Sequence, residues 1–182
     1  MAQSKQTQNS LLLRNLINFY EKDDNMDKML TIINGESTIS LRIVDWFATN
    51  FSKQYYITYE LNDKNRFKVY VDYKLKLRAY SKKRFDPFCR WDRISVPYKD
   101  GQYIQTTIGQ LNFFKWAIEN NVIEYIRDNY VEIETDMNSR NSTSKRQNVE
   151  TVNKTRKKRE ELSISASKSV HREEVKITVQ FN

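Results

Sequence analysis

A strict alternation of apolar and polar residues over positions 67–80, FKVYVDYKLKLRAY, constrains the fold more than any other feature of the chain. A period of two is typical of a β-strand, because successive side chains of a strand point to opposite faces of its sheet. The pattern predicts a long strand whose core face carries Phe67, Val69, Val71, Tyr73, Leu75, Leu77 and Ala79. The other face is then wet and basic, with Lys68, Tyr70, Asp72, Lys74, Lys76, Arg78 and Tyr80.

The segments before this strand supply helices and a shorter strand. Apolar residues at three- and four-residue spacing predict helices over about 10–21 and 26–33, and a third helix that begins near Ser37 or Thr38. Residues 55–61, YYITYEL, then predict a short strand that a polar turn joins to the long one. This arrangement places a helical layer ahead of an antiparallel pair of strands.

The segments after the long strand are shorter strands and a helix. Residues 91–107, WDRISVPYKDGQYIQTT, predict one or two short strands around a turn at 100–101. An amphipathic run over 108–133 predicts a covering helix, and Thr107 with Gln110 forms a capping-box pair that opens it. Two neighbouring asparagines in the middle of that run favour a break in the helix.

The elements together predict an α+β fold with N-terminal helices, a small antiparallel sheet containing the long basic strand, a covering helix, a flexible basic linker and a C-terminal strand. The predicted organisation is a disordered N-terminus over 1–9, a single domain over 10–136, a flexible basic linker over 137–162, and a C-terminal tail over 163–182 with a strand at 175–181. The linker is predicted from its composition. Its residues would bury too little apolar surface to offset the conformational entropy lost when the segment becomes ordered. The last strand either returns to the edge of its own sheet or extends the sheet of a partner.

Charge is distributed unevenly along the chain, whose formal net charge is +8 at pH 7. Residues 74–99 contain nine cations and two acids, and residues 139–182 contain eleven cations and five acids. Residues 100–138, between them, contain two cations and seven acids. This balance favours a polyanionic partner, but the basic and acidic segments can equally neutralise one another, or the charge can be ordinary solvated surface.

Enzymatic interpretations find little support. The single histidine, His171, lies in the predicted tail, so the domain offers no histidine base for a serine or cysteine nucleophile. One cysteine and one histidine are too few for a standard zinc site, and three glycines cannot build a phosphate-binding loop. Asp86 and Asp92 have arginines beside them, which favours ion pairing over acid–base or magnesium chemistry. The sequence predicts a protein that is not an enzyme, with no catalytic residue, metal site or cofactor.

Cysteine use and hydropathy predict the compartment. A single cysteine fits a reducing environment, and the polar first ten residues contain no apolar signal region. No apolar run approaches the length that crosses a bilayer. We therefore expect an intracellular protein that is neither secreted nor bound to a membrane.

The basic face of the long strand predicts contacts with DNA or RNA. Cations that follow the phosphates and aromatic rings on which bases stack are the two features of single-strand binding. A basic run in the linker, over 154–159, would add a flexible arm. The predicted nucleic-acid contacts are Lys68, Tyr70, Lys74, Lys76, Arg78, Tyr80, Lys82, Lys83, Arg84, Arg156, Lys157, Lys158 and Arg159.

Residues 79–95, AYSKKRFDPFCRWDRIS, alternate aromatic rings with cations and divide into two parts. Residues 80–84 extend the basic face and belong to the predicted contact surface. Residues 85–91 surround a proline and contain two large aromatic residues at their ends, so they predict a packed corner. Cys89 is predicted to pack there as a small buried side chain, although neighbouring arginines would favour a thiolate.

Three segments, STISLRIVDWFATNFSKQY, AYSKKRFDPFCR and TTIGQLNFFKWAIENNVIEYI, resemble a family of small uncharacterised proteins of nucleocytoplasmic large DNA viruses. The resemblance covers most of residues 35–130, and RFDPFCR at 84–90 is its most specific part. It implies a viral protein that acts in the cytoplasm of an infected cell, in a viral factory, or that is packaged in the virion. We expect a nucleic-acid-binding protein. The alternative is a virion structural or assembly protein that joins virion proteins, or copies of itself, through its exposed strand or C-terminal tail.

Overall fold

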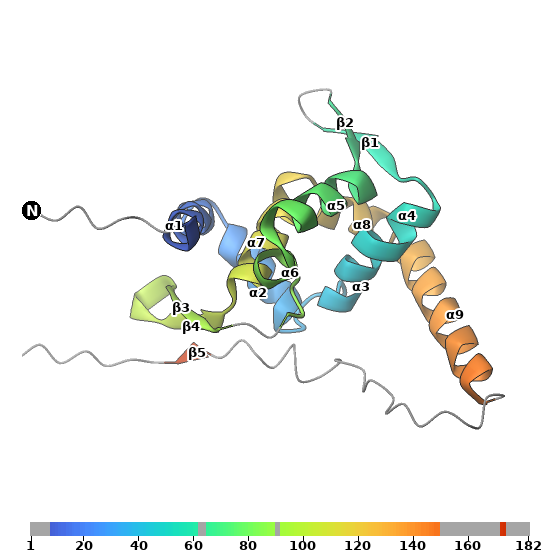
Figure 1. Cartoon of the computed structure of the whole chain (residues 1–182). Coiled ribbons are helices and arrows are strands. Elements are labelled where there is room, and N and C mark those ends of the chain that lie inside the picture. Colours follow the sequence, from blue (N-terminus) through green and yellow to red (C-terminus); the bar gives the residue numbers. More distant parts are fainter. Residues whose placement is uncertain (1–7, 62–64, 90–91, 150–171, 174–182) are drawn as a thin grey trace, which may run out of the picture.

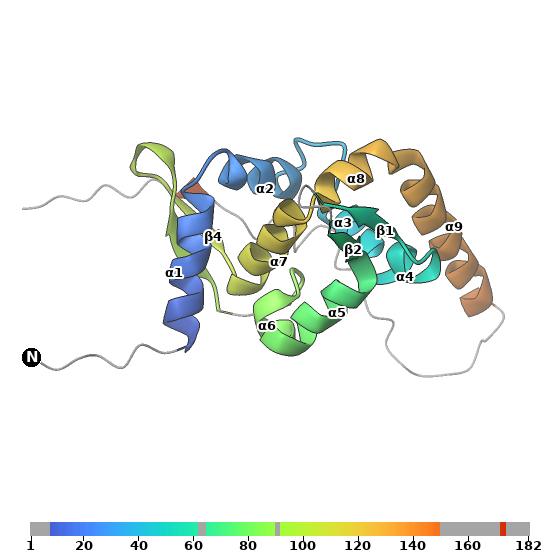
Figure 2. The same ribbon diagram turned by 90° about the horizontal axis from the view of Figure 1, so that it is seen from above.

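The computed structural model describes residues 8–61, 65–89, 92–149 and 172–173 (Figures 1 and 2). Helices predominate beside two small antiparallel sheets, so the predicted α+β class is confirmed. The first elements are α1 (Gln8–Tyr20), α2 (Asn25–Ile33), α3 (Leu41–Trp46), the π-helical turn η1 (Phe47–Phe51) and α4 (Ser52–Gln54). They confirm the three predicted helices, although Ser40 rather than Ser37 or Thr38 caps α3, its side chain accepting from the backbone N–H of Ile43.

The remaining elements alternate short strands with helices. They are β1 (Thr58–Glu60), β2 (Arg66–Lys68), α5 (Val69–Tyr80), α6 (Lys82–Phe85), β3 (Ile94–Pro97), the 3₁₀ turn η2 (Lys99–Gly101), β4 (Tyr103–Thr106), α7 (Ile108–Glu119), α8 (Val122–Asp128), α9 (Tyr130–Val149) and β5 (Arg172–Glu173). β1 and β2 form one antiparallel sheet, and the other has the order β3-β4-β5. The predicted strand pair around the turn at 100–101 is therefore confirmed.

The predicted long strand over 67–80 is wrong. Only Arg66–Lys68 pairs with β1, and the chain then enters α5. The apolar residues at every second position include those at 69, 73 and 77, which are four residues apart. A helix therefore gathers these three on one face. Val69 and Tyr73 are buried on that face. A helix satisfies its own backbone hydrogen bonds, whereas a strand of this length would need a partner much longer than β1.

The central element of the core is α7, which contacts α1, α2, α6 and α8 (Figure 2). Nine of its twelve residues are buried, as expected for a helix covered on every side. Thr107 opens it, since the Thr107 hydroxyl accepts from the backbone N–H of Gln110 at 3.2 Å. The predicted break is also confirmed, because Asn121 adopts a left-handed conformation (φ 54°) between α7 and α8.

The last helix overturns part of the predicted linker over 137–162. α9 continues to Val149, and its Met137 side chain is buried against the domain. Figure 1 shows the far end of α9 extending away from the other helices. Residues 1–7, 150–162 and the predicted strand at 175–181 lie outside the described residues. Within the described part, β5 pairs with β4 through Arg172 opposite Ile104.

Candidate nucleic-acid interface

The change from strand to helix redistributes the predicted contact residues. Lys74 and Arg78 lie one turn apart on the exposed side of α5, while Lys76 is half-buried and lies about 200° around the helix from Lys74. The ring of Tyr80 stacks on that of Phe85, with 6.1 Å between centroids and 18° between planes. The single face predicted over 68–80 is therefore not formed, and Tyr80 is half-buried and packs against the core.

The remaining predicted contacts lie after α5. Lys82 and Lys83 are exposed on α6, whereas Arg84 is half-buried and its carbonyl oxygen accepts from Asn112 Nδ2 at 2.9 Å. The four basic residues at 156–159 lie outside the described residues. The centre of the candidate surface is therefore formed by the exposed cations Lys74 and Arg78 of α5 and by Lys68, which directly precedes α5.

A hollow of about 490 Å³ lies where α4 ends and β2 passes into α5. Its lining combines two lysines, two tyrosines, two aliphatic residues and two hydroxyls: Ser52, Lys53, Tyr56, Ile57, Thr58, Lys68, Tyr70 and Val71. A second hollow of about 390 Å³ shares Tyr70 and Val71 with the first and continues along α5 to Lys74 and Arg78. We call Lys53, Tyr56, Lys68, Tyr70, Lys74 and Arg78 the basic aromatic surface.

Tyr56 is the most exposed large hydrophobic side chain of this surface, with 85% of its area accessible. Its backbone is left-handed (φ 51°), and the next N–H, that of Ile57, donates to the carbonyl oxygen of Ser52 at 3.2 Å. These features describe a Schellman motif, whose left-handed position is usually taken by glycine or asparagine. A tyrosine there costs about 1–2 kcal/mol. Backbone strain of this kind concentrates at functional sites.

No described acidic residue forms an ion pair with the cations of the basic aromatic surface. Lys53, Lys68, Lys74 and Arg78 are all exposed, and none forms an ion pair with another residue in the described ranges. Lys53 Nζ lies 5.7 Å from the ring centroid of Tyr70, in cation–π geometry. The alternative in which acidic residues of 100–138 pair with these cations is therefore wrong for these four side chains.

Tyr56 and Lys53 were not among the predicted contacts. Both precede the alternating segment, and tertiary packing of α4 against α5 brings them to it. The local sequence offers one indication of Tyr56. The segment KQYYI at 53–57 joins a predicted helix to a predicted strand, yet it contains no glycine or asparagine for the left-handed position that commonly ends a helix.

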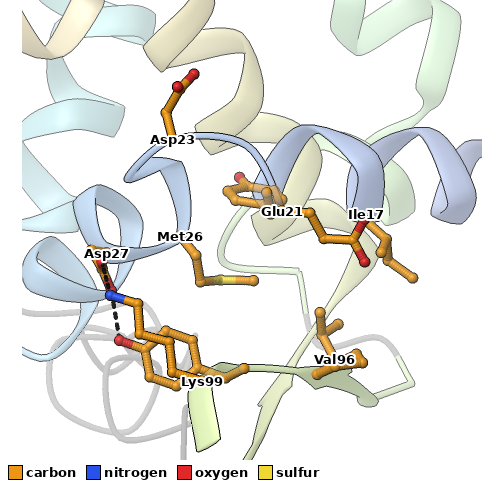
Figure 3. A pocket seen from close by; sticks show the side chains of 10 residues that line it. Ile17, Glu21, Asp23, Met26, Asp27, Val96 and Lys99 are labelled. Carbon is orange, nitrogen blue, oxygen red and sulfur yellow. Dashed lines mark hydrogen bonds and ion pairs between the residues drawn. The ribbon is translucent and has the colours of Figure 1, made fainter.

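A third hollow, of about 310 Å³, lies between the α1–α2 turn and the β3–β4 hairpin (Figure 3). Its lining includes Glu21 and Asp23, both exposed, together with Asp27. Asp27 accepts from the Tyr98 hydroxyl at 2.6 Å and pairs with Lys99 Nζ at 2.5 Å. This hollow has the wrong charge for a phosphate ligand, and its interactions hold the hairpin to α2.

The predicted packed corner at 85–91 is confirmed for its described residues. Phe85 is fully buried, and its ring contacts those of Tyr73, Phe113 and Trp116. The expected ion pairing of Asp86 is wrong within the described chain, because its carboxylate instead accepts from the backbone N–H of Phe88 at 2.9 Å. Cys89 is half-buried rather than fully enclosed.

Asp45, half-buried on α3, interacts electrostatically with Asp86 of this corner and has a shifted pKa. Burial, and secondarily the charge of Asp86, raise the pKa of Asp45 to about 7. Burial also raises the pKa of Tyr73, with smaller contributions from Asp45 and Asp86.

Across the described ranges, no group of three His, Cys, Asp or Glu side chains is placed to hold a metal ion. No described helix has both the length and the apolar character required to cross a bilayer.

The comparisons with known proteins agree with the resemblance seen in the sequence. Residues 2–180 match the model of a family of unknown function (DUF7197). Over 130 residues, 66% of the chain, the sequence is 43% identical to an uncharacterized protein, L507, of Acanthamoeba polyphaga mimivirus. The chain spans about half the length of that relative. No solved structure matches the chain. The predicted resemblance to giant-virus proteins is thus confirmed, and the chain belongs to the DUF7197 family.

Proposed function

We propose that the protein binds nucleic acid through the basic aromatic surface. The observation that carries this proposal is an exposed tyrosine, Tyr56, held on a strained backbone in a surface whose four cations form no ion pair with a described residue. Lys53 and Lys68 line the first hollow, and Lys74 and Arg78 line the second. Phosphates would lie along these cations while bases contact the aromatic rings. The ligand is DNA or RNA in the viral factory of an infected cell or in the virion.

Four phosphate contacts would make binding strongly dependent on salt. Each neutralised phosphate releases condensed counterions, so log K falls with log salt concentration with a slope of about −0.7 to −0.9 per contact. The basic aromatic surface should therefore give a slope of roughly −3 to −4. Basic residues outside the described ranges would make the slope steeper.

A charge-matched pair of variants tests the proposal. Lys74→Ala/Arg78→Ala removes two cations from the surface. Arg14→Ala/Lys22→Ala removes two exposed cations from α1 and the α1–α2 turn that form no ion pair with any described residue. We expect the first variant to weaken oligonucleotide binding and to make the salt slope shallower by about 2. The control should change neither quantity appreciably. Absence of oligonucleotide binding by the unaltered protein at about 50 mM salt would refute the proposal.

A second candidate function is virion structure or assembly, favoured by two exposed aliphatic residues. Val71 and Leu75 lie one turn apart on α5 with 52% and 57% of their areas accessible. An apolar pair at this spacing is a common anchor for a helix or groove of another protein. Val71→Ser/Leu75→Ser should abolish self-association or assembly, measured by sedimentation, if this candidate is correct. If Val71→Ser/Leu75→Ser sediments as the unaltered protein does, while Lys74→Ala/Arg78→Ala loses oligonucleotide binding, the assembly candidate is excluded and only the nucleic-acid proposal is supported.

A further inference from the structure

We infer that the first hollow receives an unpaired base, so that the ligand is a single strand rather than a duplex. This inference rests on the proposed function and specifies the ligand of the same surface. It concerns Tyr56, which has an accessible ring, and the hollow of about 490 Å³ beside it. The volume falls within the range of sites that enclose small organic groups.

The lining of the hollow suits the face and edge of a base. Ile57, Tyr70 and Val71 give it apolar walls, and Tyr56 adds a ring that no other described aromatic residue covers. In a duplex each base is stacked on its neighbours, and its faces are not available to a side chain. An unpaired base offers a whole face, and stacking on an aromatic side chain is worth about 1–3 kcal/mol.

The two tyrosines have different roles in this arrangement. Lys53 Nζ lies 5.7 Å from the centroid of Tyr70, so a cation already occupies one face of that ring. Tyr70 is half-buried and serves as a wall, while Tyr56 is the stacking residue. Lys53 and Lys68 both line the hollow, and so lie where they can contact the phosphates next to an inserted base.

The polar groups of the hollow offer few directed hydrogen bonds that could distinguish one base from another. The Ser52 hydroxyl donates to the carbonyl oxygen of Ala48 at 3.0 Å and is buried. Thr58 supplies an exposed hydroxyl, and the lysines are long and carry only donors. Stacking without directed hydrogen bonds tolerates any base, so we expect weak sequence preference.

The cations extend from the hollow along α5 over a short distance. From Tyr70 to Arg78 the helix rises by about 12 Å, with Lys74 and Arg78 one turn apart. This length accommodates a few nucleotides. A short oligonucleotide is therefore sufficient to occupy the whole surface.

The backbone of Tyr56 provides a way to separate binding from folding. Glycine adopts a left-handed conformation without strain, so Tyr56→Gly should raise the melting temperature while removing the stacking ring. Tyr56→Phe keeps the ring and the strain. If Tyr56 were present only for packing, Tyr56→Gly would lower the melting temperature.

The test measures the affinity of the full chain for fluorescent oligothymidylate of about 15 nucleotides and for a duplex of equal length. The unaltered protein should bind the single strand more tightly. Tyr56→Gly should lose about 5- to 150-fold in affinity for the single strand, should bind the duplex as before and should melt at a higher temperature. Tyr56→Phe should keep the affinity of the unaltered protein for both ligands.

Each other outcome overturns a defined statement. Equal affinity for single strand and duplex, with normal salt dependence, would overturn the unpaired-base inference and leave the proposed function in place. No binding of either ligand would overturn both. Equal losses in Tyr56→Phe and Tyr56→Gly would overturn stacking as the role of the ring, as would a lower melting temperature in Tyr56→Gly.

Discussion

Gly109 on α7 lies against the carbonyl oxygen of Asp86, at the end of α6, so closely that a β-carbon at 109 would come within 2.7 Å of it. The same β-carbon would lie 3.4 Å from the carbonyl oxygen of Lys83. The backbones of α6 and α7 therefore touch without an intervening side chain. This contact anchors the packed corner that follows α5.

We expect Gly109→Ala to destabilise the protein, although alanine is the better helix former. The intrinsic helical gain is about 1 kcal/mol, whereas overpacking at such a contact costs about 1–3 kcal/mol, and the obstructing atom is backbone. The net loss should appear as a lower denaturation midpoint in urea. A midpoint equal to that of the unaltered protein would show that α6 can move away at little cost.

Asp136 should be essential for holding α9 against the domain. Its carboxylate accepts from Trp46 Nε1 at 2.9 Å and from the Tyr55 hydroxyl at 3.3 Å, and it pairs with Arg140 at 2.9 Å. Asp136→Ala leaves the partly buried Trp46 N–H without this acceptor, which costs about 1–3 kcal/mol. Hydrogen exchange should become faster in α9.

The neighbouring Thr135→Ala provides the control for this variant. Thr135 is exposed, and among the described residues its hydroxyl bonds to the carbonyl oxygen of Val131 in the same helix and to no other group. Its replacement should change the free energy of unfolding by no more than about 0.5 kcal/mol. Similar effects of the two substitutions would contradict the role assigned to Asp136.

Asp45 should make the protein less stable as the pH rises. Its folded-state pKa of about 7 lies above the usual value, so between about pH 4 and pH 7 the folded state binds a proton that the unfolded state has released. Folding stability is then lost across this window as pH increases. Asp45→Asn mimics the neutral acid and should be more stable than the unaltered protein at pH 8, by up to about 4 kcal/mol.

Urea denaturation at pH 4, 6 and 8 measures this effect. The two proteins should be of similar stability at pH 4 and diverge progressively towards pH 8, with Asp45→Asn the more stable. A constant difference at all three values would mean that the carboxyl group of Asp45 does not titrate in this range.

Tyr59 should fix the β1–β2 hairpin to the end of α7. Its hydroxyl donates to the carbonyl oxygen of Asn120 at 2.7 Å, and its ring stacks on Tyr125 with 5.0 Å between centroids. Tyr59→Phe removes only the hydrogen bond and should cost about 1 kcal/mol, whereas Tyr59→Ala should cost several times more. Equal losses in thermal unfolding would show that the ring stacking contributes nothing.

The sequence predicted the elements whose pattern has a single interpretation. The spacing of apolar residues in α1, α2 and α7, the cap at Thr107 and the break at Asn121 are all local features, and all are present. The segment over 67–80 has apolar residues at every second position, which include those at every fourth. Its conformation therefore depended on the length of strand available beside it.

The candidate site was predicted only in part, because it is assembled by tertiary contacts. Lys68, Tyr70, Lys74 and Arg78 were predicted from a strand face. Lys68 ends β2, and the other three remain together on α5, since positions 70, 74 and 78 also follow a four-residue spacing. Position 76 does not follow that spacing, so Lys76 departs from the group. Tyr56 could not be found from periodicity, since its exposure arises from the left-handed turn after α4.

Two breaks divide residues 108–149 into α7, α8 and α9. Because of them, an insertion in one of these helices would displace the contacts that the next helix makes with the domain. An unbroken helix over this range would be about 63 Å long and could not fold back on the domain. One residue added within α8 would rotate everything after it by about 100° and carry Asp136 away from Trp46. Length changes should therefore be tolerated far less in the seven residues of α8 than their small number suggests.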